Sequence, residues 1–138
     1  MLDPVSIFDA WLRQSGTFAT YMGTVGGAVP VACPVLPEGF ANTSKAIVFH
    51  PEGTQHHVTG GNHRTTFLCK CYGGSDSYST ARAVGVALYE HTHNQGGEIA
   101  DAYIHKFEVL DEFQGGDEPS DGWPTHIVRV QMLWSELP

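Results

Sequence analysis

Residues 64–88 read RTTFLCKCYGGSDSYSTARAVGVAL, and they place a strand directly before a helix. The first part, RTTFLCKCY, is rich in the threonine and aromatic side chains that fit the surface of a pleated sheet. Side chains alternate along a strand, so the odd-numbered residues from Thr65 to Cys71 share one face. The glycine pair at 73–74 then ends the strand.

The second part predicts an amphipathic helix that runs to about His91. Asp76 or Ser77 can cap its N-terminus through a side-chain oxygen. Its buried stripe follows spacings of three and four residues and comprises Tyr78, Ala81, Val84, Ala87 and Leu88. The many small side chains in this segment would let the helix lie close to a sheet.

Patterns on either side add further elements. An N-terminal helix begins with Asp3 as its cap and Pro4 in its first turn, and Gly16 ends it. Further strands are expected at 45–50, 102–113 and 125–134, and the loop at 114–123 joins the last two into a hairpin. Strict alternation in the first strand of this hairpin would place Tyr103, His105, Phe107 and Val109 on one face.

Residues 16–43 are rich in glycine and proline and hold a single charged residue, Glu38. This composition predicts an extended segment with turns, and with an edge strand around 29–35. A neutral stretch of this length is too apolar for a solvated linker. We therefore expect it to pack against the body of the protein or against a neighbouring chain.

Together these elements predict one α+β domain over residues 1–138. Its mainly antiparallel sheet would have about four to five strands, with two helices packed on one face. A chain of this length, with 41% hydrophobic residues, can bury one real core.

The composition disfavours several classes of function. The chain has 15 acidic and 7 basic residues, and the basic ones form no patch, which argues against tight binding of DNA or RNA. No stretch approaches the length of a membrane span, and we expect no signal peptide. The three cysteines fit no disulfide framework, so a reducing cytoplasm is the expected compartment. Only 16% of residues are charged, which suggests that part of the surface is covered by other subunits.

An acidic run without any basic residue is the first candidate site. It comprises Glu108, Asp111, Glu112, Asp117, Glu118 and Asp121. Such a run can line a channel that repels DNA, or it can be the solvated tip of a hairpin. Trp123 follows it, either as a packing anchor or as an exposed interface aromatic.

Histidines are the second candidate. His56, His57 and His63 share one loop near Cys69 and Cys71, and His91 and His93 lie at a helix end. These side chains could supply zinc ligands, but their spacing matches no established zinc pattern, and loop histidines beside buried cysteines explain them as well. No Gly-x-Ser-x-Gly or phosphate-loop motif occurs. We therefore expect no catalytic residue, metal or cofactor.

Residues 45–88 resemble the tail-completion, or tail-terminator, family of long-tailed bacteriophages. Members carry a strand that ends in an aromatic residue and a glycine, then a short Ser/Thr/Asp turn, then a helix with an early alanine and a late leucine. The Asp-Pro start of the N-terminal helix and the closing hairpin also fit. The matching positions are Tyr72, Gly73, the turn at 75–77, Ala81 and Leu88.

The resemblance implies a structural role and not an enzymatic one. Members form a ring, usually hexameric, that terminates the tail tube and joins the tail to the head in the virion neck. The implied partners are other copies of the chain, the tail-tube protein and the head–tail connector or adaptor, with DNA passing through unbound. Assembly would take place in the host cytoplasm. Two alternatives stay open: another neck component, such as a head-completion or adaptor protein, or a small metal-dependent hydrolase that uses the loop of His56, His57 and His63.

Overall fold

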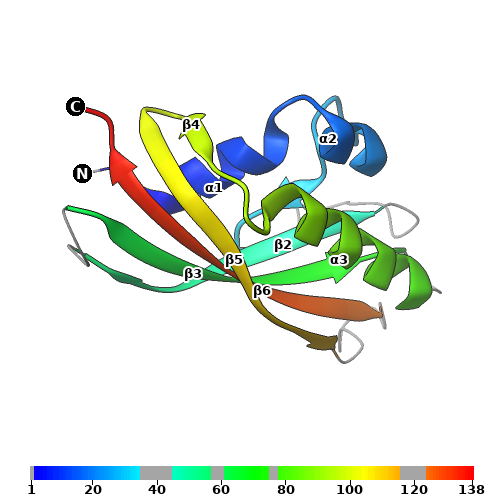
Figure 1. The fold of residues 1–138 in the computed structure, drawn as a ribbon. Coiled ribbons are helices and arrows are strands. Elements are labelled where there is room, and N and C mark those ends of the chain that lie inside the picture. The colour runs from blue at the N-terminus through cyan, green and yellow to red at the C-terminus, as the bar shows by residue number, and fades with distance from the viewer. Residues whose placement is uncertain (1, 35–44, 57–60, 75–77, 116–123) are drawn as a thin grey trace.

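The computed structural model describes residues 2–34, 45–56, 61–74, 78–115 and 124–138. Within these residues, one curled sheet of six strands carries three helices on the same side (Figure 1). The helices are α1 (Pro4–Arg13), α2 (Thr17–Met22) and α3 (Tyr78–Thr92). The strands are β1 (Val31–Ala32), β2 (Ala46–Gln55), β3 (His63–Tyr72), β4 (Gly97–Ile99), β5 (Ala102–Gln114) and β6 (Thr125–Glu136).

The sheet has the strand order β1-β2-β3-β6-β5-β4. Every neighbouring pair is antiparallel except β1 and β2, which run parallel. The expected mixture of helices and a mainly antiparallel sheet is therefore confirmed. The expected counts of four to five strands and two helices are too low, because the short strand β4 and the short helix α2 carry little periodic signal.

Helix α2 lies in the segment that was expected to be extended from residue 16. That expectation is wrong for Thr17–Met22, which form a helix between Gly16 and Gly23. Phe18 and Met22 stand one helical turn apart, and both are buried in the main core, so tertiary packing stabilises a helix too short to persist alone. Strand β1 does fall inside the expected edge strand at 29–35.

The main core lies between the helices and the sheet. Phe8 of α1 is fully buried and stacks on Phe67 of β3, with ring centroids 4.3 Å apart. Its edge meets Phe49 of β2 at 5.1 Å and Phe107 of β5 lies at 5.8 Å, so one side chain ties α1 to three strands. Truncation of such a residue to alanine typically costs about 3–5 kcal/mol.

Strand β5 departs from strict alternation. Its pairing with β6 shifts register between Ile104 and Lys106, and again between Val109 and Asp111. Each bulge inserts one residue, and the first of them lets both Ile104 and Phe107 face the helices, where they are fully buried. The expected grouping of Tyr103, His105 and Phe107 on one face is therefore wrong, because it assumes a strand without bulges.

The opposite face of the sheet, called the outer face here, carries no described helix. Along β6 the fully buried Val128, Val130 and Met132 face the helices, and the residues between them, such as Arg129 and Gln131, point to the outer face and are partly exposed. A small separate cluster of Ala46, Val48 and Tyr72 is buried at one end of β2 and β3.

Gly85 sets how closely α3 approaches the sheet. A Cβ atom at this position would lie 2.4 Å from Cδ2 of His126 on β6, far inside normal contact. His126 has little room to move, because it is only 5% exposed and is bonded on both ring nitrogens. The expected small-residue contact between this helix and the sheet is confirmed at Gly85.

We expect Gly85→Ala to destabilise the protein by roughly 1–3 kcal/mol, although alanine is normally the better helix former. The clash with His126 is the cause, so Gly85→Ala should be neutral or stabilising in a His126→Ala background. Urea unfolding of the four variants of this cycle measures the coupling. A Gly85→Ala protein as stable as the parent would contradict the close contact.

Candidate interaction surface

The acidic residues at the end of β5 do not share one face. Glu108 pairs in register with Gln131 and Asp111 with Arg129, so both belong to the outer face. Glu112 pairs with Val128 and belongs to the face that carries the helices. The other predicted members of this site, Asp117, Glu118, Asp121 and Trp123, lie outside the described residues.

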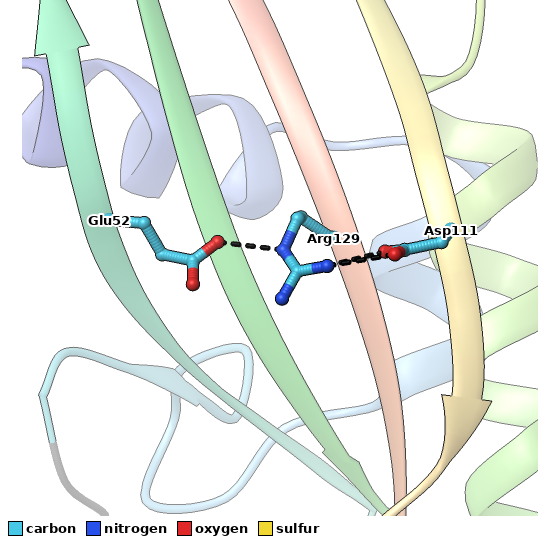
Figure 2. A network of polar contacts seen from close by, with 3 residues as sticks. All are labelled: Glu52, Asp111 and Arg129. Carbon is cyan, nitrogen blue, oxygen red and sulfur yellow. Dashed lines mark hydrogen bonds and ion pairs between the residues drawn. The ribbon is translucent and has the colours of Figure 1, made fainter.

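Asp111 takes part in a three-residue ion network on the outer face (Figure 2). Arg129 of β6 donates from Nε to Glu52 of β2 at 2.8 Å, and from Nη1 to both carboxylate oxygens of Asp111 at 2.8 and 3.0 Å. The bond to Glu52 and the nearby Asp111 charge raise the pKa of Arg129 above its usual value. The acidic run contains no basic residue, but Arg129 of the neighbouring strand β6 provides a basic partner for Asp111.

Glu112 belongs to a second network, between β5, β6 and α3. Nε2 of His126 lies 3.1 Å from a Glu112 carboxylate oxygen, and Nδ1 of His126 lies 3.0 Å from the Tyr78 hydroxyl. Together with the close approach at Gly85, these bonds fix the start of α3 against the sheet. Glu112 therefore has a structural role within the subunit, because its carboxylate already contacts His126.

Exposed apolar side chains accompany the acids on β5. Leu110 is 43% exposed and Phe113 is 46% exposed, and the side chain of Glu108 beside them makes no hydrogen bond or ion pair with a described residue. Leu110 is the residue that the second bulge inserts, and Phe113 pairs with Ile127 on the outer face. Large exposed apolar residues grouped with charged ones are typical of protein–protein contact sites.

A groove of about 780 Å³ lies between the α1–α2 segment and α3. Its lining includes Trp11, Phe18, Tyr21, Val86, Ala87 and His91. Two of the lining residues, Trp11 and His91, are joined by a pair of hydrogen bonds. Nε1 of Trp11 donates to the His91 carbonyl at 3.1 Å, and Nε2 of His91 donates to the Trp11 carbonyl at 2.8 Å. The groove was not predicted from sequence, because it depends on helix α2.

Of the predicted histidines, the structure brings His56 and His63 together. Nδ1 of His56 and Nδ1 of His63 lie 3.1 Å apart across the β2–β3 hairpin, but His57 lies outside the described residues. His91 binds the Trp11 carbonyl, whereas His93 accepts from the backbone amide of Val109 at 3.1 Å. Within the described residues, no group of three or more potential ligands is placed to hold a metal ion.

The cysteines are equally unsuited to nucleophilic chemistry. Cys69 and Cys71 are fully buried in the main core on β3, and burial raises the pKa of both thiols well above the usual value. Cys33 is partly exposed, and burial together with the charges of Asp3 and Asp9 raises its pKa as well. A reactive cysteine needs the opposite shift.

Comparisons with known proteins add no family assignment: no family model matches this chain, and no curated protein or solved structure matches it significantly. In the described part of the chain, no helix is both long and apolar enough to span a membrane.

The residues that sequence reasoning missed are Glu52 and Arg129. Their opposite charges indicate a contact only when the strand register is already known, and the sequence does not give that register.

We expect one thiol, that of Cys33, to react with DTNB at pH 8 in the native protein, and all three to react in urea. The reason is that Cys69 and Cys71 are buried and their thiols stay protonated. Absorbance of the released thiolate counts the reactive groups. Cys33→Ser is the control and should leave the native protein unreactive, and rapid reaction of three thiols without urea would contradict this burial.

We expect the stability of the protein to fall as the pH drops through about 6.5, in part because of His91. Burial lowers the pKa of His91 in the folded state, although its bond to the Trp11 carbonyl acts in the opposite direction. The unfolded chain therefore takes up a proton there before the folded one does, and the stability present above this pH is lost below it.

Urea unfolding between pH 5 and pH 8 tests this expectation. His91→Gln keeps a donor for the Trp11 carbonyl but cannot titrate, so its stability should vary less with pH than that of the parent. Equal pH dependence in the two proteins would show that His91 makes no contribution.

Proposed function

We propose that the protein is a structural subunit of a bacteriophage neck, and that its copies form an oligomeric ring of the tail-terminator type. The ring, with about six subunits in the family that the sequence resembles, would end the tail tube and join tail to head. Its partners would be the tail-tube protein on one side and the connector or adaptor on the other. Assembly in the host cytoplasm would precede its place in the virion.

The observation that carries the proposal is the exposed end of β5. Leu110 and Phe113 stand nearly half exposed beside the ion network of Glu52, Arg129 and Asp111, on a sheet face without a described helix. An isolated subunit gains nothing from such exposure, whereas a neighbouring subunit would bury it. The low charge content of the whole chain points the same way.

The charge distribution also suits a ring through which DNA passes. The chain carries a formal charge of −8, and its seven basic residues are scattered along the sequence, which disfavours tight binding of the phosphate backbone. Of the acids on β5, Asp111 and Glu112 add little to a repelling channel wall, because Arg129 and His126 contact them. Glu108 is exposed and its side chain has no described partner, which leaves it available to a neighbouring subunit.

We expect purified protein to assemble with rising concentration into a species of about six subunits with an open centre. Light scattering gives the mass, and electron microscopy of the largest species gives the shape. A closed dimer, or a monomer at every concentration, would contradict the proposed ring. A ring that binds connector protein but not tail-tube protein would favour the head-completion or adaptor alternative.

The metal-dependent alternative rests on one observation, the 3.1 Å separation of the His56 and His63 nitrogens. This distance is close to that between two ligands on one zinc ion, but it equally suits a hydrogen bond. Metal analysis of the purified protein decides between them. Stoichiometric zinc that is lost in His63→Gln would favour the hydrolase, and folded protein free of zinc would exclude it.

A further inference from the structure

We propose that β5 of one subunit packs against α3 of the next, so that the exposed end of β5 meets the groove between α2 and α3 in a head-to-tail contact. This interface rests on the proposed ring and names the two surfaces that would build it. The occupant of the groove is a second copy of this chain.

On the β5 side, the contact surface is apolar with a charge at its edge. Leu110 and Phe113 supply the apolar part, and Glu108 precedes them on the same strand. The β5 bulge between Val109 and Asp111 is what leaves Leu110 outside the core. These side chains protrude from a strand that β6 supports, so the surface is formed before any contact.

On the α3 side, Val86 is 45% exposed and Tyr89 is 38% exposed, and Val86 borders the groove. Trp11 and Phe18 line the opposite wall. Phe18 stacks on His91 with ring centroids 4.7 Å apart, and burial favours the neutral form of His91 by lowering its pKa. The groove therefore offers aromatic and aliphatic walls of the kind that accept a leucine or phenylalanine side chain.

The distribution of charged side chains indicates which surface of the second copy fits the groove. Of the seven basic residues, five have partners within their own chain: Arg13, Lys45, Arg64, Lys70 and Arg129. The side chains of Arg82 and Lys106 make no hydrogen bond or ion pair with any described residue. Arg82 stands one helical turn before Val86 on α3 and directly precedes Ala83, and both Ala83 and Val86 line the groove.

The charges that lack a partner among the described residues are complementary between the two surfaces. The groove side carries the cation Arg82 and the anion Glu90, and the β5 side carries the anion Glu108 and the cation Lys106. Arg82 opposite Glu108 and Glu90 opposite Lys106 would pair all four. Because the two surfaces differ and lie on different sides of the sheet, their contact is heterologous, which is the contact that builds a closed ring.

A charge-reversal cycle tests the contact. Arg82→Glu alone and Glu108→Arg alone each place like charges opposite each other, and we expect each to weaken assembly at least about tenfold. The double variant restores opposite charges and should assemble within about threefold of the parent. Sedimentation equilibrium up to millimolar concentration measures the assembly constant of each protein.

Glu98→Arg is the matched control, because Glu98 is an exposed β4 glutamate without a described partner, and the change in net charge is the same as in Glu108→Arg. It should assemble like the parent. Circular dichroism and urea unfolding confirm that each variant folds.

The outcomes separate the interface from the ring. A parent that forms rings and charge reversals that leave its assembly unchanged would overturn this interface and leave the proposed function standing. Loss of assembly in both single variants without rescue in the double variant would also overturn the pairing. A parent that never associates would overturn the ring and the interface together.

Discussion

The register of β5 against β6 is the constraint on which the other features depend. The first of two bulges in β5 lets both Ile104 and Phe107 face the core, where Phe107 meets the Phe8 ring of α1. The second bulge leaves Leu110 outside that core and puts Asp111 opposite Arg129. Without these insertions the strand would present alternate residues strictly, and its apolar and acidic side chains would exchange faces.

The other side of the domain depends on close packing of helices against that sheet. Gly85 admits His126 beneath α3, and Trp11 and His91 exchange hydrogen bonds between α1 and α3. These contacts hold α3 in place while its outward residues, Val86 among them, remain in solvent. A groove on the helix side and an apolar projection from β5 give one subunit two unlike surfaces, as a ring requires.

The elements with a clear periodic pattern could be predicted from the sequence, whereas the short helix and the bulges could not. Strand β3, helix α3 and the hairpin of β5 and β6 carry clear period-two or helical patterns, so their type could be predicted. Helix α2 could not, since glycine flanks it at both ends and tertiary contacts, such as the burial of Phe18 and Met22, stabilise it. The bulges of β5 were missed because only pairing reveals them. The acidic run was predicted as one site, but the register divides Asp111 from Glu112.

Hydrogen–deuterium exchange at low and high protein concentration tests the account most directly. If β5 and α3 of neighbouring subunits meet, amides at 110–114 and in the exposed turns of α3 should exchange more slowly in the assembled protein. Amides of β4 should be unaffected. Protection that appears instead along β2, with none at the end of β5, would contradict the account.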